Sequence, residues 1–281
     1  MKKSLYLFSA ALLVFVSCTS DYENSCIKKN DSNPVKNDTI SPPKTDTIPV
    51  VVEPILLKKL VHTYANGDET TVDLLYNDTK IISDKEGSNV TTYTYDGDVV
   101  KKIEKADVSD GVYISNEYFY ANGKLDYIFS NEFGNYYITK YTYNNDGSVF
   151  YNKINSDSLK NDKGDTPISG RYTFSEGNLI MHQYYNGAYE SVITYLYDSK
   201  NNPRVNVLGF DLLVDSNQGF AVKNNVIKKT TKNNSNPDNT LVETEVVSYT
   251  YEYDANGYPT KRTEVTQTGN KTTTETSSYS Y

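Results

Sequence analysis

Beyond residue 56, short runs of alternating aromatic and polar residues dominate the chain, and most of them stop at a glycine or an asparagine. Residues 93–97 read YTYDG, and residues 141–147 read YTYNNDG. Side chains two positions apart lie on the same face of a strand, so each run presents tyrosine to one side and threonine to the other. Asn-Gly and Asp-Gly pairs tolerate the positive φ of a tight hairpin turn. The pattern therefore predicts β-hairpins with one buried face that tyrosine lines.

The aromatic run recurs along this whole part of the chain. Its copies begin at intervals of 19 to 31 residues, at Leu74, Tyr93, Tyr118, Tyr141, Tyr172, Tyr195, Phe220, Tyr251 and Tyr279. Such a period is typical of one supersecondary unit that packs on its neighbours. We expect an all-β domain over residues 55–281, built as an antiparallel hairpin meander of about 14–18 strands. Because that many twisted strands curl, the meander should roll into an open or closed barrel.

Charges in the strands bear on the surroundings of this barrel. Residues 99–105 read VVKKIEK and residues 258–264 read YPTKRTE, so charged side chains fall on both faces of each strand. Strands of an outer-membrane barrel need an apolar stripe that faces lipid. The sequence therefore favours a water-soluble barrel, and a membrane-embedded channel is the alternative.

One aliphatic segment interrupts the repeats. Residues 205–214 read VNVLGFDLLV and follow Asn202-Pro203, where the tyrosine pattern stops. We expect this insert, residues 202–219, to form a short helix or an irregular plug in the mouth of the sheet. A second apolar segment, residues 50–61, is expected to supply the first strand or strands.

The N-terminus has the pattern of an export signal. Lys2 and Lys3 precede an uncharged apolar run over residues 5–16, which suits a signal-peptide core and is too short to span a bilayer. The run ends in Ser17-Cys18, which resembles a bacterial lipobox. That resemblance implies cleavage after residue 17, a thioether-linked diacylglycerol on Cys18 and acylation of the new amino terminus. Two or more acyl chains anchor a protein stably.

A polar segment, residues 18–54, follows the signal peptide. It holds five of the nine prolines of the chain and is rich in Asn, Asp, Ser and Thr. Such a composition cannot bury enough apolar surface to fold, so we expect an extended, disordered tether after the lipidated Cys18. Residues 20–23 (SDYE) resemble the surface-export signal of Bacteroidetes lipoproteins, and the DTI triplets at Thr39 and Thr47 are similar to the O-glycosylation sequon of that phylum. The resemblance implies an outer-membrane lipoprotein that faces the cell surface or the periplasm.

Composition and charge exclude several classes of protein. Of the 281 residues, 27 are tyrosine and none is tryptophan, so the hydrophobic share of 37% contains little aliphatic mass for helices on both faces of a sheet. A formal net charge of −8 does not suit a nucleic-acid-binding protein. Apart from Cys18, the one other cysteine is Cys26, so neither a disulfide framework nor a zinc site is expected.

The C-terminal half resembles a known family. The segments that carry the resemblance are residues 197–203 (YDSKNNP), 223–228 (KNNVIK) and 249–261 (YTYEYDANGYPTK). They are similar to a Bacteroidetes lipoprotein family that carries a domain of unknown function with a porin-like fold. The repeats also resemble the YD repeats of large polymorphic-toxin shells. The family implies no catalytic residues.

No motif along the chain supplies obvious chemistry. His62 and His182 are expected to be ordinary strand residues, and no nucleophile elbow, P-loop or metal-binding motif occurs. We therefore expect no enzyme, no cofactor and no metal. A paired-carboxylate glycosidase stays an alternative, because such a pair is formed in space and not in sequence.

The expected function is binding of a glycan or a protein by a surface lipoprotein. Tyr184, Tyr185 and Tyr189 flank the Asn186-Gly187 turn and depart from the two-apart spacing of the repeats. Tyrosine offers an apolar ring with a hydroxyl at its edge. These three residues are therefore the candidate ligand-binding patch, placed at the same end of the barrel as the insert. The alternative is that their rings cover the insert.

Overall fold

The computed structural model describes residues 53–214, 222–235 and 238–281. The described residues belong to one compact unit, Val51–Tyr281. The signal peptide, Cys18, the tether up to residue 52, Thr39 and Thr47 lie outside the described residues. Within the described ranges, no helix combines the length and the apolar character needed to cross a membrane.

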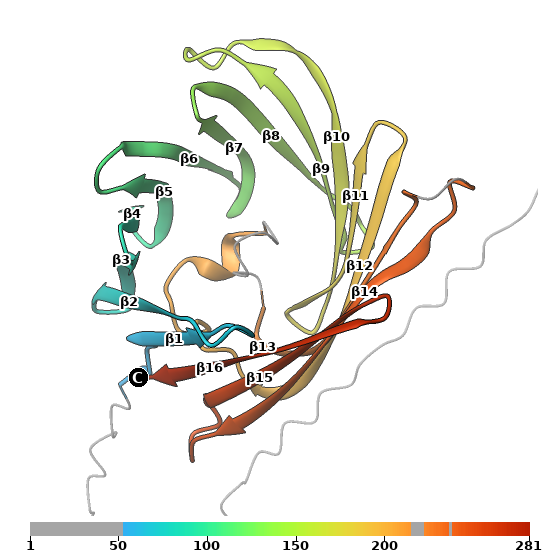
Figure 1. The fold of residues 1–281 in the computed structure, drawn as a ribbon. Helices are drawn as coiled ribbons and strands as arrows, with labels where there is room; N and C mark the ends of the chain where they lie inside the picture. Colours follow the sequence, from blue (N-terminus) through green and yellow to red (C-terminus); the bar gives the residue numbers. More distant parts are fainter. Residues whose placement is uncertain (1–52, 215–221, 236–237) are drawn as a thin grey trace, which may run out of the picture. The chain divides into compact units, whose positions relative to one another are not determined.

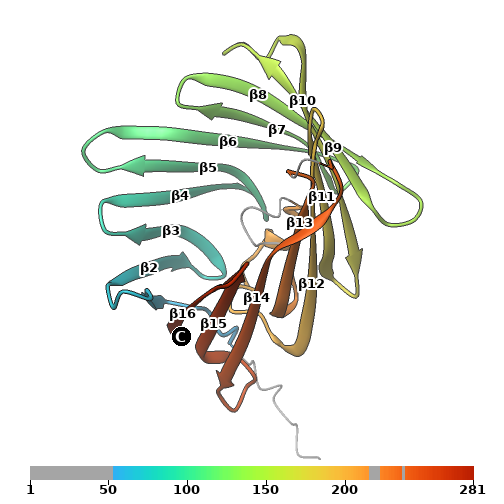
Figure 2. The same ribbon diagram turned by 45° about the vertical axis from the view of Figure 1, so that its right-hand side comes forward.

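Antiparallel strands that follow one another in sequence make up the structure (Figure 1 and Figure 2). The strands are β1 (Lys59–Thr63), β2 (Glu69–Asn77), β3 (Lys80–Glu86), β4 (Asn89–Asp96), β5 (Val99–Asp107), β6 (Gly111–Ala121), β7 (Lys124–Glu132), β8 (Asn135–Tyr143), β9 (Val149–Ser156), β10 (Asp162–Ser175), β11 (Asn178–Asn186), β12 (Tyr189–Asn201), β13 (Asn224–Asn233), β14 (Val242–Tyr253), β15 (Pro259–Thr268) and β16 (Lys271–Ser280). Each strand pairs with the next, and β1 also pairs with β16, with Leu60 opposite Tyr279.

The pairing of the first and last strands closes the barrel, so the all-β prediction is confirmed and the choice between an open and a closed barrel is decided. The faces of the strands also agree with the tyrosine pattern. Tyr118 and Tyr141, which the spacing placed inside, are 1% and 8% exposed, whereas Thr142 and Glu252 are exposed to solvent. A barrel of sixteen strands is wide enough to leave a lumen.

The hairpin order gives the barrel two distinct ends. At one end, which we call the plug end, lie the turns after the even-numbered strands β2 to β14, the start of β1 and the end of β16. At the other, the far end, lie the turns after the odd-numbered strands β1 to β15. The insert follows β12 and therefore belongs to the plug end, whereas the Asn186-Gly187 turn follows β11 and belongs to the far end.

A β-bulge recurs in the hairpins near the plug end. The pairing register shifts by one residue at the second aromatic position of the repeat, for example between Thr94 and Tyr95 and between Phe119 and Tyr120. The same shift occurs in the hairpins β2–β3, β10–β11, β12–β13 and β14–β15. Bulges increase the local twist and bend of a sheet, which a closed barrel needs.

The second tyrosine of a repeat is bonded to the preceding hairpin. Its hydroxyl donates to a backbone carbonyl in that hairpin. The carbonyl belongs to the residue that pairs with the second aromatic residue of that hairpin, as Val100 pairs with Tyr95. Four such bonds measure 2.6 to 3.0 Å: Tyr120 to Val100, Tyr143 to Leu125, Tyr197 to Leu179 and Tyr281 to Pro259. In β14 the first tyrosine of the copy, Tyr251, makes the corresponding bond to Val226 at 2.8 Å. Burial raises the pKa of Tyr143 to about 12, so its hydroxyl stays protonated and donates at neutral pH. These bonds give the tyrosine hydroxyl a structural role that phenylalanine could not fill.

Replacing Tyr120 by phenylalanine should lower the free energy of unfolding by about 1–2 kcal/mol, because the Val100 carbonyl loses its tyrosine donor while the ring stays in place. Chemical denaturation measures the difference. Phe174 occupies the equivalent place in β10, so the control is the reverse change, Phe174→Tyr, which removes no hydrogen bond. A Tyr120→Phe variant as stable as the original chain would show that the hydroxyl contributes nothing.

The insert enters the lumen at the plug end, as the aliphatic pattern predicted. It forms the 3₁₀ turn η1 (Phe210–Leu212), drawn in light orange inside the barrel in Figure 1. Phe210 and Leu213 are 2% and 0% exposed, and the Phe210 ring lies 5.9 Å from the Tyr93 ring. The Leu208 amide donates to the Thr79 carbonyl at 3.0 Å, which fixes the insert to the β2–β3 turn. We call the described part of the insert, residues 202–214, the plug.

The plug belongs to the main hydrophobic core. Its buried residues form one cluster with inward side chains of β2 to β11, and Leu57, which precedes β1, joins the same cluster. Within the described part of the apolar segment, residues 53–61, the strand begins at Lys59, the first residue of β1. The plug fills the plug-end part of the lumen between these strands.

Candidate functional site

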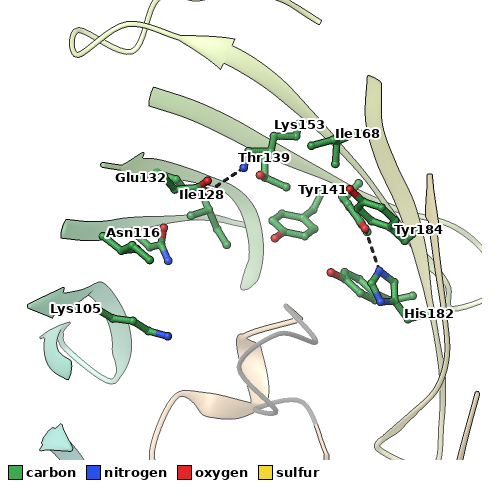
Figure 3. A pocket seen from close by; sticks show the side chains of 14 residues that line it. Lys105, Asn116, Ile128, Glu132, Thr139, Tyr141, Lys153, Ile168, His182 and Tyr184 are labelled. Carbon is green, nitrogen blue, oxygen red and sulfur yellow. Dashed lines mark hydrogen bonds and ion pairs between the residues drawn. The ribbon is translucent and has the colours of Figure 1, made fainter. Parts of the chain in front are cut away.

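A cavity lies in the lumen between the plug and the far end (Figure 3). Its volume is about 380 Å³, and it is formed by inward side chains of β5 to β11. They are Lys105, Ile114, Asn116, Ile128, Ser130, Glu132, Thr139, Tyr141, Tyr151, Lys153, Ile168, Tyr172, His182 and Tyr184. A lining that combines aromatic rings with a few polar groups is typical of a small-molecule site.

A continuous row of six rings runs along one wall of this cavity, and we call it the aromatic track. Each ring comes from an inward position of β8 to β12, and the row ends at the far end of β12. Successive centroid distances are 6.4 Å for Tyr141–Tyr151, 5.0 Å for Tyr151–Tyr172, 4.6 Å for Tyr172–His182, 6.4 Å for His182–Tyr184 and 6.2 Å for Tyr184–Tyr189. Tyr189 is 38% exposed, whereas Tyr141, Tyr151, Tyr172 and His182 are buried, so the track leads from the floor of the cavity to its rim.

The floor of the track is held rigidly. The Tyr151 hydroxyl and His182 Nε2 are 2.9 Å apart in a hydrogen bond. Burial lowers the pKa of His182 to about 4, so the imidazole is neutral at pH 7. The Tyr151 ring lies directly over Gly170 of β10, where a Cβ atom would come within 2.4 Å of that ring and of the Gln183 carbonyl. A glycine at this position is what leaves room for the ring.

Polar and charged groups face the track. Figure 3 shows Lys105 and Asn116 on the side of the cavity opposite to Tyr184 and His182. Lys153 Nζ forms an ion pair with Glu132 Oε1 at 2.8 Å and lies 3.9 Å from the centroid of the Tyr137 ring. Among the described residues, no carboxylate forms an ion pair with Lys105.

Three ion pairs lie on the other side of the lumen. The His62 ring bonds to Glu275 at 3.1 Å, Arg262 pairs with Glu264 at 3.1 Å, and Lys229 pairs with Glu245 at 2.9 Å. These pairs join inward positions of β13 to β16 and β1 and stabilise the closed barrel. His62 and His182 are both strand residues, as predicted, and the described ranges contain no group of three or more acidic, histidine or cysteine side chains placed to hold a metal ion.

The structure divides the three tyrosines of the predicted patch. Tyr184 and Tyr189 lie on the inner face and belong to the aromatic track. Tyr185 pairs with Glu190 on the outer face of the same hairpin, where burial and the nearby Glu190 carboxylate raise its pKa. The prediction that this turn shares an end with the insert is wrong, because β12 separates the two. The described part of the insert, residues 202–214, packs against Tyr93 and the β2–β3 turn, and these tyrosines do not belong to its core cluster.

Comparison with known proteins shows the fold and nothing finer. No protein-family model matches the chain, and neither does any curated protein sequence. Two crystal structures of porin-like proteins are similar to the barrel. One, from Bacteroides vulgatus, has a TM-score of 0.52 at 18% identity and covers 81% of this chain and 99% of its own. The other, from Bacteroides uniformis, has a TM-score of 0.51 at 14% identity and covers 80% and 97%.

The barrel is porin-like in fold. The fold that the family resemblance implied is therefore confirmed, and the solved structures come from the phylum that it named. A shared fold does not transfer a function, which has to be argued from the site.

Proposed function

We propose that this protein is a water-exposed, lipid-anchored barrel of the outer membrane that binds a glycan in its lumen without acting on it. The observation that carries the proposal is the cavity with its aromatic track and facing polar groups. Tyrosine rings stack on the apolar faces of sugars, and amides, hydroxyls and charges bond the sugar hydroxyls. A concave site of this volume suits a small ligand better than a folded protein, so the glycan is the favoured ligand.

The plug supports binding over conduction. Phe210, Leu213 and Val207 are buried against the barrel wall at the plug end, so the cavity has a floor. Ion pairs on the outward face of the wall, such as Lys102–Glu104 at 2.7 Å and Lys261–Glu252 at 3.6 Å, place charges where a continuous lipid-facing belt would have to run. A channel protein needs an open lumen and an apolar outer belt. The plug and the outward ion pairs both oppose that arrangement and favour a barrel that stands in water.

The charge content of the cavity supports a protein that does not hydrolyse its ligand. Glycosidases use two carboxyl groups that flank the scissile bond. Of the described side chains that line the cavity, Glu132 is the one carboxylate, and Lys153 neutralises it. We therefore propose binding alone, with no cofactor or metal.

Binding should depend on Tyr184 and not on its neighbour Tyr185. The test uses the chain from residue 19 onward on an array of neutral and acidic glycans. Tyr184→Ala should weaken the binding of any glycan that the original chain binds on the array by about tenfold, because a ring is removed from the aromatic track. Tyr185→Ala removes the same ring from the outer face and should bind normally. Equal losses in both variants, or no loss in either, would place the ligand elsewhere.

Attachment to the membrane should depend on Cys18. We expect cells that express the full chain to incorporate a fatty-acid analogue into this protein, and Cys18→Ala to abolish the label, because the thioether acceptor is gone. Cys26→Ala is the matched control and should be labelled like the original chain. Labelling of Cys18→Ala at the original level would refute the anchor.

A further inference from the structure

The ligand can be specified further from the charges of the cavity, and this step rests on the proposed function. Three charged side chains line the cavity: Lys105, Lys153 and Glu132. Lys153 and Glu132 neutralise each other at 2.8 Å, so Lys105 leaves the cavity with one net positive charge. The chain as a whole carries a formal net charge of −8. A positive cavity in an acidic protein selects for a negatively charged ligand.

Three other cations that face the lumen are paired with a carboxylate, and Lys105 differs from them. His62, Arg262 and Lys229 each face a carboxylate at 2.9 to 3.1 Å. Lys105 lies on β5 near the far end, half-buried and aimed into the cavity, and no described carboxylate pairs with it. An ammonium group that is partly withdrawn from water gains from a bound anion, because a charge-assisted hydrogen bond replaces lost hydration.

The aromatic track adds the shape of the ligand. Its rings follow one another at centroid distances of 4.6 to 6.4 Å from the cavity floor to Tyr189 at the rim. A row of rings of this kind suits a chain of sugar residues better than a single sugar. Lys105 faces the track from the opposite side (Figure 3).

We propose that the cavity binds an acidic oligosaccharide, with its sugar rings along the aromatic track and a carboxylate or sulfate group on the Lys105 ammonium. The oligosaccharide enters the cavity from the far end of the barrel, past Tyr189. Asn116, Ser130 and Thr139 supply uncharged partners for sugar hydroxyls.

Pairs of ligands that differ only in charge test this proposal. The chain from residue 19 onward is titrated with an oligogalacturonate and with its methyl ester, which has the same skeleton without the carboxylate charges. A sulfated neutral oligosaccharide and its unsulfated form make a second pair. The charged member of at least one pair should bind about tenfold more tightly than the uncharged one. The pair that shows the difference identifies the anionic group.

Variants of Lys105 connect the charge preference to this residue. Lys105→Met should reduce binding of the charged ligand to the level of its uncharged form, whereas Lys105→Arg should keep the preference. Lys101→Met is the control, since Lys101 lies on the outer face of β5, 4.4 Å from the centroid of the Phe119 ring. It should leave the preference unchanged. Melting curves establish that all three variants are folded.

The outcomes separate this inference from the proposed function. A preference for charged ligands that survives in Lys105→Met would refute the role of Lys105. Equal binding of charged and uncharged forms, or an array on which only neutral glycans bind, would refute the acidic ligand and leave glycan binding intact. An array on which no glycan binds, acidic or neutral, would overturn both proposals.

Discussion

Replacing Tyr118 by alanine should lower the free energy of unfolding by about 3–5 kcal/mol, the range for truncating a large buried aromatic side chain. Tyr118 is 1% exposed and is among the largest fully buried side chains of the described chain. It lies on β6 opposite Ile128 and belongs to the same core cluster as Phe210 of the plug. Its removal opens a void in this core cluster, and the surrounding strands cannot collapse freely because backbone hydrogen bonds hold them in the barrel.

Urea denaturation followed by circular dichroism measures this loss. Thr142→Ala is the control, because Thr142 is an exposed position on β8 and should change stability by no more than about 0.5 kcal/mol. Equal losses in the two variants would mean that the inner and outer faces contribute equally, against the burial pattern.

Gly170→Ala should be nearly as costly, with an expected loss of about 3 kcal/mol, at the upper end of the range for overpacking. The added Cβ would lie 2.4 Å from both the Gln183 carbonyl and the Tyr151 ring. The carbonyl belongs to the β10–β11 ladder and cannot move far, so the Tyr151 ring has to leave its place. Its hydrogen bond to His182 would then be lost and the floor of the cavity rearranged.

Two measurements check this expectation together. The melting temperature should fall, and glycan binding should weaken even under conditions in which the variant is fully folded. Ser169→Ala changes the neighbouring residue, which pairs with Tyr185 on the outer face, and should alter neither quantity. A Gly170→Ala chain with unchanged stability would mean that the strands separate easily at this point.

The fold could be predicted to a large extent because its determinants are local. Alternation in runs such as residues 93–97 assigns inner and outer faces, and Asn-Gly and Asp-Gly pairs mark the turns. The break in the pattern after Asn202 correctly predicted the plug. Closure could not be predicted, because it depends on β1 meeting β16, which places His62 beside Ser277, 215 residues away in the sequence.

The site could be predicted only in part, for a related reason. Tyr184 and Tyr189 attract attention as aromatic residues beside a turn, but applying the two-residue period there would have placed Tyr185 on the outer face. Lys105 and His182 carry no local signal, since each resembles any other strand residue. They are functional candidates because inward residues of seven strands, β5 to β11, meet around one cavity. Which residue of a strand reaches that cavity depends on the register, and the bulges change the register within the hairpins.

The hydrogen bonds between repeats suggest how such a barrel can change in size during evolution. Where the pattern is complete, a hairpin brings an acceptor carbonyl opposite its second aromatic residue and a tyrosine donor for the hairpin before it, so duplicating such a hairpin adds a donor together with an acceptor. Insertion or deletion of whole hairpins would then preserve the bonding pattern and keep the strand number even. The first copy fits this account: no repeat precedes Tyr76, and its hydroxyl is buried without a hydrogen-bond partner among the described residues. Tyr76 is therefore the position at which a tyrosine donor has no earlier hairpin to bond to.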